Sequence, residues 1–590
     1  MRVRSARSIL AALTAVLAIS APACLRSRSE EADLILTHGI VHTLAGDDRR
    51  ASAMAVLQGR LLAVGDEDQV LRHRGPRTPV LDLKGATVVP GFVDAHGPLL
   101  GAGETLLNES TGDSLYVDLA DTESEEDAVQ RVRARARGLP PGGWVLGKGW
   151  DEERWTRKDL PDKRLLSDIV QNNPAFLVRR DGHAAWVNHR ALEAAGIGSR
   201  TPDPPGGRIV RATRSGEPSG ILLDRAWEPA LRRVPPLGPE DRTAALLLAL
   251  QRYAALGYTA VQAEGSPGRL GLLDLGAKGD EVADLLRALA GAGRLPIRVS
   301  LLVPAPSEAA EALLVRGPEI GLADGRLDVR TVELFADGAF ESRGAALLQP
   351  YADDPSTSGL GILGAEEIAA WAARGMRRGV QVAVHARGDA ALRAAAKGFA
   401  KAVSLSPGAD PRFRVEGLAL FDAADLPVLA RARVIATVRP ASVDAGPEGL
   451  LEERRVGAER AGRLYAFGSL LEAGLPLAGT SGSFDRPQPA ILGFYCAVTR
   501  RGPDGAPPGG WHAGQRLERR EALRLFTLGA AYASFHDTDA GTLVPGKWAD
   551  FTVLSQDILA VPEDRLLATE VLATYVGGQP AYRRERAAGP

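Results

Sequence analysis

A regular alternation of short apolar runs and amphipathic segments fills the middle of the chain and constrains its fold more than any other feature. Runs typical of buried strands lie at 258–262, 297–303, 329–335, 380–384, 413–415, 434–437 and 475–478. Segments with helical spacing lie between them, at 241–256, 280–292, 366–379, 389–402 and 520–533. Strand followed by helix, repeated about eight times, requires parallel strands joined by crossover helices. The pattern predicts an α/β protein with a (β/α)8 barrel of the TIM type.

The two ends of the chain have a different texture. Residues 32–89 and 537–583 consist of short apolar or alternating runs separated by turns such as Gln58-Gly59-Arg60, which is typical of small sheets. We expect these two segments to form one composite β-sandwich domain around a barrel at 90–536. Residues 111–235, rich in Trp, Pro and Gly, do not follow the barrel rhythm. They are predicted to form a subdomain inserted after the first barrel strand.

The first 24 residues have the layout of a bacterial export signal. Three arginines precede an apolar run at 9–19, and small residues follow up to Cys24. The run is too short for an ordinary transmembrane helix. The segment before Cys24 resembles a lipoprotein box, but plain cleavage after Ala23 fits as well. We therefore expect an exported protein, either periplasmic or held at a bacterial membrane by a lipid on Cys24, with no other membrane contact.

The overall charge balance excludes one class of partner. The 590 residues are 45% hydrophobic and 24% charged, with a formal net charge of -2. A nucleic-acid-binding surface normally requires a clear excess of Lys and Arg. The expected partner is a small molecule, as substrate or ligand, and no nucleic acid.

A polar pair ends the apolar stretch that opens the barrel. Asp94 and His96 follow Pro90-Gly91-Phe92-Val93 and are two residues apart. Alternate side chains of a strand share a face. Both should therefore point the same way at the carboxyl end of the first barrel strand, where barrel enzymes carry their chemistry.

Several longer motifs occur in a fixed order along the chain. They are Gly149-Trp150-Asp151-Glu152, Arg180-Asp181-Gly182-His183-Ala184-Ala185-Trp186-Val187-Asn188, Leu334-Phe335-Ala336-Asp337-Gly338-Ala339 with Ser342-Arg343-Gly344-Ala345, Val382-Ala383-Val384-His385-Ala386 with Gly388-Asp389, and Gly546-Lys547-Trp548-Ala549-Asp550. With the stretch around His96, they resemble amidohydrolase family 3 of the amidohydrolase superfamily, the branch that includes N-substituted formamide deformylases. The resemblance runs from about residue 33 to 582.

The resemblance implies hydrolysis of a non-peptide C–N bond. In this family one or two divalent metals polarise the carbonyl and activate a water, and an aspartate after the last strand acts as general base. The metal ligands that the family motifs imply are a His-x-His pair, a lysine that is often carbamylated, and two further histidines.

This sequence departs from that set at several positions. Pro98 stands at the position of the second histidine, and Glu333 at that of the lysine. Gly417 stands at the position of a later histidine, Gly482 at that of the general base, and Ser442 at that of a histidine after Gln-Pro. His96 and His385 are kept. These substitutions exclude a two-metal centre. His96, Glu333 and His385 could still hold one divalent metal, with zinc as the first choice, and Asp485 is a candidate for a displaced base.

Four further residues are candidates for the wall of a substrate pocket: Trp150, Asp151, His183 and Arg343. Trp150, Asp151 and His183 come from the inserted subdomain, and they could instead serve only to pack it against the barrel. Arg343 could instead brace a loop together with Asp337 through an ion pair.

Two functions of different class follow from these residues. The chain could be a hydrolase of the family that cleaves an amide-like bond in a small molecule with at most one metal. Alternatively, it could be a catalytically inactive, exported relative that binds a small ligand, because Pro98, Gly417 and Gly482 replace two metal ligands and the general base.

Overall fold

The structure is a computed structural model that describes residues 30–46, 50–112, 114–265, 270, 272, 281–444, 450–482 and 486–585. The predicted export signal at 1–24, with Cys24, lies outside these residues. Within them, no helix combines the length and the apolar character needed to cross a membrane.

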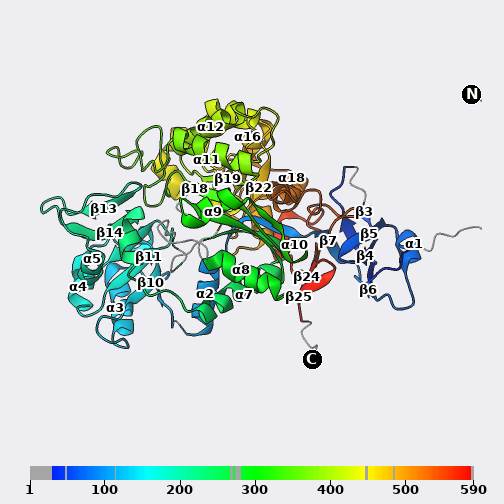
Figure 1. The fold of residues 1–590 in the computed structure, drawn as a ribbon, viewed down its shortest axis with the longest axis horizontal. Helices are drawn as coiled ribbons and strands as arrows, with labels where there is room; N and C mark the ends of the chain where they lie inside the picture. The colour runs from blue at the N-terminus through cyan, green and yellow to red at the C-terminus, as the bar shows by residue number, and fades with distance from the viewer. Residues whose placement is uncertain are drawn as a thin grey trace, which may run out of the picture.

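Eight parallel strands form the barrel at the centre of the molecule (Figure 1). In the order of their hydrogen-bonded neighbours they are β8 (Phe92–Pro98), β15 (Tyr258–Glu264), β16 (Arg298–Ala305), β18 (Leu327–Phe335), β19 (Gln381–His385), β20 (Arg414–Glu416), β21 (Ile435–Val438) and β22 (Leu477–Gly479). The sheet is nearly closed. Where β22 ends beside β8, the hydroxyl of Thr480 donates to the carbonyl of His96 at 2.5 Å. The predicted (β/α)8 barrel is confirmed.

Helices cover the outer face of the barrel. They include α2 (Leu100–Ser110), α7 (Pro239–Ala255), α8 (Glu281–Gly291), α9 (Glu308–Arg316), α11 (Ala365–Arg378), α12 (Asp389–Ser404), α13 (Leu426–Arg431), α16 (Phe467–Glu472) and α17 (Ala490–Thr499). Their buried Leu, Ala and Val side chains join those of the strands in one large apolar core. Burial of this apolar surface is the main term that stabilises the barrel.

The helix predicted at 520–533 is interrupted. It consists of α18 (Arg519–Arg524), a π-helical turn over Leu525–Gly529, and α19 (Ala530–Ala533). The turn lies where the chain passes closest to β22, since a Cβ atom on Gly529 would stand 2.1 Å from the carbonyl oxygen of Leu477. The wider turn lets the backbone approach the strand, which hydrophobic periodicity alone does not predict.

Both chain ends contribute to one sheet domain beside the barrel. The first sheet runs in the order β5 (Arg60–Gly65), β4 (Ala53–Leu57), β1 (Leu34–Thr37) and β6 (Val80–Asp82). The second runs β25 (Gln579–Arg583), β24 (Val571–Val576), β23 (Phe551–Leu554), β7 (Thr87–Pro90), β2 (Ile40–His42) and β3 (Arg50–Ala51). Apolar residues from both termini share one core cluster. Figure 1 shows the blue and red ends of the chain meeting in this domain.

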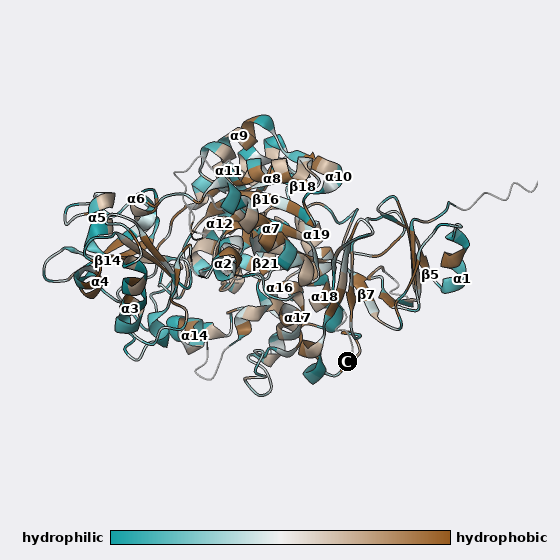
Figure 2. Ribbon diagram, turned by 90° about the horizontal axis from the view of Figure 1, so that it is seen from below, coloured by the Kyte–Doolittle hydropathy of each residue, from teal (hydrophilic) through white to brown (hydrophobic). Residues whose placement is uncertain are grey.

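The inserted subdomain lies on the opposite side of the barrel from the sheet domain (Figure 1). Its mixed sheet runs β13 (Gly207–Arg211), β14 (Pro218–Asp224), β12 (Ala184–Val187), β11 (Ala175–Arg179), β10 (Val145–Trp150) and β9 (Val117–Asp118). One face packs on α3 (Glu125–Ala136) and α4 (Lys163–Ile169), and the other on α5 (His189–Ala195) and α6 (Glu228–Leu231). In Figure 2 these strands are largely brown, whereas the helices carry teal residues as well, as expected for amphipathic helices over an apolar sheet.

Candidate functional site

A cleft of about 1070 Å³ opens at the carboxyl ends of the barrel strands, where the inserted subdomain faces the barrel. His96, Glu264 and His385 line it from the barrel, and Asp151 and His183 line it from the subdomain. In a (β/α)8 barrel this end carries the functional side chains. The cleft is therefore the candidate functional site.

His96 and Glu333 form a direct pair at the floor of the cleft. The Nε2 atom of His96 donates to Oε1 of Glu333 at 2.7 Å, and the Glu333 side chain is fully buried. Burial alone would lower the pKa of His96, but the negative charge of Glu333 and its hydrogen bond raise it to about 10. His96 is thus an imidazolium that donates to Glu333 at neutral pH.

His385, the third predicted ligand, ends β19 in the same cleft but makes a different contact. Its ring stacks on that of His183, with the ring centroids 6.0 Å apart. Its buried Nε2 has no hydrogen-bond partner among the described residues. Burial lowers the pKa of His385, and the positive charges of His183 and Arg387 lower it further. His385 is therefore a neutral imidazole.

These residues do not fit the metal centre that the family motifs imply. No group of three or more His, Cys, Asp or Glu side chains in the described part of the chain is arranged to hold a metal ion. Pro98 and Gly417 offer no donor atom. Zinc bound to both His96 and Glu333 would hold their N and O atoms about 3.3 Å apart, whereas these atoms lie 2.7 Å apart and bond to each other.

His183 belongs to a second charged pair, which the subdomain brings to the barrel. Its Nδ1 atom donates to Asp224 at 2.8 Å, and its backbone N–H donates to Asp181 at 3.0 Å. Burial lowers the pKa of His183, but the hydrogen bond and charge of Asp224 outweigh it and raise the pKa to about 9. A cationic His183 thus faces the neutral ring of His385.

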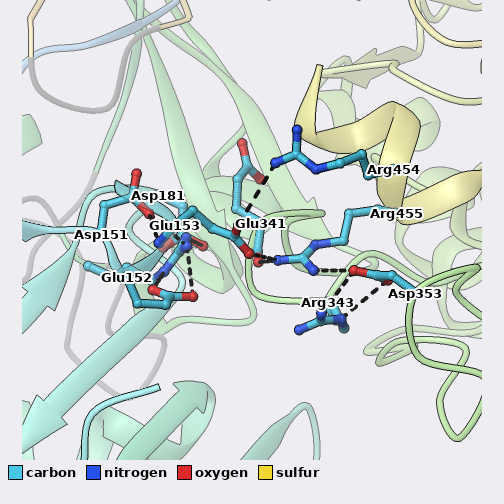
Figure 3. Close-up of polar contacts among 10 residues, drawn as sticks. Asp151, Glu152, Glu153, Asp181, Glu341, Arg343, Asp353, Arg454 and Arg455 are labelled. Atoms are coloured by element: carbon cyan, nitrogen blue, oxygen red, sulfur yellow. Dashed lines mark hydrogen bonds and ion pairs between the residues drawn. The ribbon is translucent and has the colours of Figure 1, made fainter. Parts of the chain in front are cut away.

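Asp151 and Trp150 are adjacent in sequence but differ in position. Asp151 lines the cleft and pairs with the buried guanidinium of Arg179 at 3.0 Å (Figure 3). Trp150 is fully buried, packs on Trp155 and Trp186, and donates from its indole N–H to a backbone carbonyl at 2.9 Å. On a strand, neighbours point to opposite sides, so Trp150 belongs to the subdomain core and does not line the cleft.

Arg343 also lies apart from the residues that line the cleft. Its guanidinium pairs with Asp353 at 2.9 Å. Arg455 binds the same aspartate and also pairs with Glu153 of the subdomain at 2.7 Å (Figure 3). Arg343 is thus part of an ion-pair network that joins the subdomain to the barrel loops. Its partner is Asp353, whereas the sequence reasoning paired it with Asp337, which instead accepts backbone N–H groups.

Asp337 joins two barrel loops. Its carboxylate accepts the backbone N–H groups of Ala346, Arg387 and Gly388 at 2.8–2.9 Å. Although these bonds favour the anion, burial raises the pKa of Asp337 to about 7. The remaining sequence candidate, Asp485, lies outside the described residues.

The charged residues of the cleft region that are absent from the sequence prediction include Glu264, Arg387, Glu416 and Arg439. Glu264 and Glu416 are the last residues of β15 and β20, so the rule that led to His96 could have found them. Burial and the charge of Glu333 raise the pKa of Glu264 to about 7. Arg387 and Arg439 stand in loops after β19 and β21, and no spacing rule marks such residues.

Comparison with known proteins agrees with this fold. The profile of the amidohydrolase family matches residues 79–582. The N-substituted formamide deformylase of Arthrobacter pascens is 28% identical over 575 residues, which cover 94% of this chain and 98% of that protein. Protein LONG AFTER FAR-RED 3 of Arabidopsis thaliana is 30% identical over 93% of this chain and 92% of its own length.

A solved structure shares the fold of this chain. The crystal structure of an uncharacterised metal-dependent hydrolase from Pyrococcus horikoshii superposes with a TM-score of 0.69 at 26% identity, covering 90% of this chain and 99% of that one. Metal-dependent hydrolysis is thus found among the relatives. The family profile, the long alignments and the common barrel agree, and this chain belongs to the amidohydrolase family of hydrolases.

Proposed function

We propose that this chain is a small-molecule-binding member of the family whose cleft does not assemble the metal centre of its relatives. The observation that carries the proposal is the direct bond between His96 and Glu333, together with Pro98, Gly417 and Gly482 at positions where the family motifs have donors or the general base. The cleft has a volume of about 1070 Å³ and polar groups that converge on it, which suits the binding of a small molecule.

The residues of the cleft offer fixed charges and hydrogen-bond donors to a ligand. His183 presents an imidazolium held by Asp224. Glu264, with its pKa near 7, can donate or accept a proton at neutral pH. Such a site orients a polar molecule by charge and hydrogen bonding.

A thermal-shift screen after exhaustive chelation tests this proposal. The chain should be stabilised by one class of small polar molecules in the presence of EDTA, because no bound metal contributes to the site. Hydrolysis of N-substituted formamides or simple amides that depends on added Zn²⁺ would overturn the proposal.

The second candidate is a hydrolase that acts on amide-like C–N bonds with one metal, zinc by preference. Two atoms favour it: Oε2 of Glu333 and Nε2 of His385 are buried and have no hydrogen-bond partner among the described residues. With His96 they would form the two-histidine, one-carboxylate set that can hold zinc with an open position. This candidate requires the His96–Glu333 bond to open.

The location of the protein is a separate proposal that depends on its first residues. We propose that the chain is exported and tethered through a lipid on Cys24, since a basic segment, an apolar run and small residues precede that cysteine. Labelled palmitate should be incorporated into the wild type and not into a Cys24→Ala variant. Equal labelling of both would refute the lipid anchor.

A further inference from the structure

Two glycines stand where the family motifs have functional side chains, and each has an arginine beside it. A Cβ atom on Gly482, the position of the general base, would lie 2.7 Å from Cδ and 2.9 Å from Cγ of Arg439. A Cβ atom on Gly417, the position of a histidine ligand, would lie 3.3 Å from Cδ of Arg387. Real Cβ atoms do not approach other heavy atoms to 2.7 Å, so the space beside residue 482 is taken by Arg439.

The backbone conformation at both positions also favours glycine. Gly482 has φ +50° and Gly417 has φ +67°, values that glycine adopts at little cost. In the loops after β20 and β22, a glycine with positive φ thus lies beside an arginine side chain. At this end of the barrel, two positions thus lack the side chains that the family motifs have, and a guanidinium-bearing side chain lies beside each.

The guanidinium of Arg439 lies at the cleft. It lines the cleft, and its buried Nε has no hydrogen-bond acceptor among the described residues. Burial and the positive charge of Arg387 both lower the pKa of Arg439. Glu341 and Glu452 act on this charge from a distance, but among the described residues no carboxylate bonds to it directly. A partly buried cation without a bonded counter-charge is unfavourable, and an anionic ligand would reduce that cost.

Arg387 is held so that part of its guanidinium stays available. Its Nη2 donates to the hydroxyl of Tyr465 at 3.1 Å and lies 3.9 Å from Glu452. Its buried Nε has no acceptor among the described residues. The carboxylate of Asp337 accepts its backbone N–H and so fixes the loop.

Two glutamates share the electrostatic field of these arginines but do not cancel their charge. Glu452 accepts the hydroxyl of Tyr465 at 2.7 Å, and burial and the charge of Glu341 raise the pKa of Glu452. Burial would also raise the pKa of Glu341, but the charge of Arg387 keeps it below its usual value. Glu341 is therefore the more readily ionised of the two glutamates and the main counter-charge beside the arginines.

We propose that Arg387 and Arg439 form a subsite for the oxyanion of a small molecule, a carboxylate or a phosphoryl group, at the end of the barrel where the family motifs place the metal ligands. Guanidinium groups bind such oxyanions through paired, charge-assisted hydrogen bonds. This inference rests on the proposed binding function and names its ligand class. The ligand is an organic anion, and the arginines orient it.

Calorimetric titration of the chain from residue 25 onward tests the subsite. The probes are acetate, inorganic phosphate and neutral acetamide, all at constant ionic strength with EDTA. Acetate or phosphate should bind, and acetamide should bind at least about tenfold more weakly, since it carries no charge for the guanidinium groups. The stronger of the two anions identifies the carboxylate or the phosphoryl source.

Variants locate the binding. Arg439→Gln and Arg387→Met should each weaken the anion about tenfold or more, and Arg439→Lys should retain part of the affinity because it keeps the charge. Arg374→Met is the matched control, an exposed arginine of α11 that pairs with Glu311, and it should bind as the wild type does.

Equal binding of acetate and acetamide, or unchanged anion affinity in a folded Arg439→Gln protein, would overturn the oxyanion subsite while leaving the binding function intact. Zinc-dependent amide hydrolysis would instead overturn the proposed function itself. Near-UV circular dichroism of each variant verifies folding before titration.

Discussion

Replacement of Arg179 by methionine should destabilise the inserted subdomain and disorder the loop that carries His183. The Arg179 guanidinium is 2% exposed and pairs with Asp181 at 3.0 Å and with Glu152 at 2.8 Å, besides Asp151. These three carboxylates are labelled in Figure 3. Asp181 also accepts the backbone N–H of His183. One cation thus holds three carboxylates and the loop at the edge of the cleft.

The expected loss of stability follows from the burial of the partners. The Glu152 and Asp181 side chains are 6% and 3% exposed, so the variant leaves two buried carboxylates without a cation. Removing one partner of a buried pair costs about 3–5 kcal/mol, and Asp151, at 17% exposure, adds little. The loss should shrink as the pH falls, because carboxylates without a cation have raised pKa values and become protonated.

Urea unfolding followed by tryptophan fluorescence measures this effect directly. Trp150, Trp155 and Trp186 pack together in the subdomain core, and the Arg179 guanidinium lies 5.9 Å from the Trp150 ring. The matched control is Arg190→Met, whose pair with Glu193 is 47% and 70% exposed and should contribute under about 1 kcal/mol. Equal stability of the Arg179 and Arg190 variants would refute the reasoning.

Three further outcomes are expected from contacts elsewhere in the molecule. Asp550→Ala should cost about 3–5 kcal/mol in calorimetry, because it leaves Arg298, 8% exposed, without its carboxylate; a loss like that of a surface pair would contradict this. Burial outweighs the charge of Asp557 and lowers the pKa of His42. Neutral His42 therefore contributes fully to stability above its unfolded-state pKa of about 6.5, and this contribution declines as the pH falls through its lower pKa in the folded state. His42→Asn should flatten that decline in urea titrations, and an unchanged slope would argue against it. Burial raises the pKa of the Cys496 thiol to about 12, so the native chain without its first 24 residues should resist iodoacetamide until urea is added; rapid native alkylation would be inconsistent with a buried thiol.

The barrel could be predicted from periodicity because its strands are short, apolar and buried on both faces. Predicted runs such as 258–262 and 380–384 correspond to β15 (Tyr258–Glu264) and β19 (Gln381–His385). The π-helical turn over Leu525–Gly529 could not be predicted in this way, because it depends on a tertiary contact with β22.

The candidate site was only partly predictable. His96, His183 and His385 lie in one cleft, as their motifs indicate. The family motifs bring His96 and Glu333 together as possible ligands of one metal, but they do not predict the direct bond between the two side chains. Likewise, only packing shows that Arg439 takes the space beside Gly482.

The metal content of the purified chain from residue 25 onward tests the central claim most directly. Plasma mass spectrometry after dialysis against Zn²⁺ should find no stoichiometric metal, and His96→Ala and His385→Ala variants should not differ from the wild type. About one equivalent of zinc in the wild type, lost in either variant, would contradict the account and establish the one-metal site.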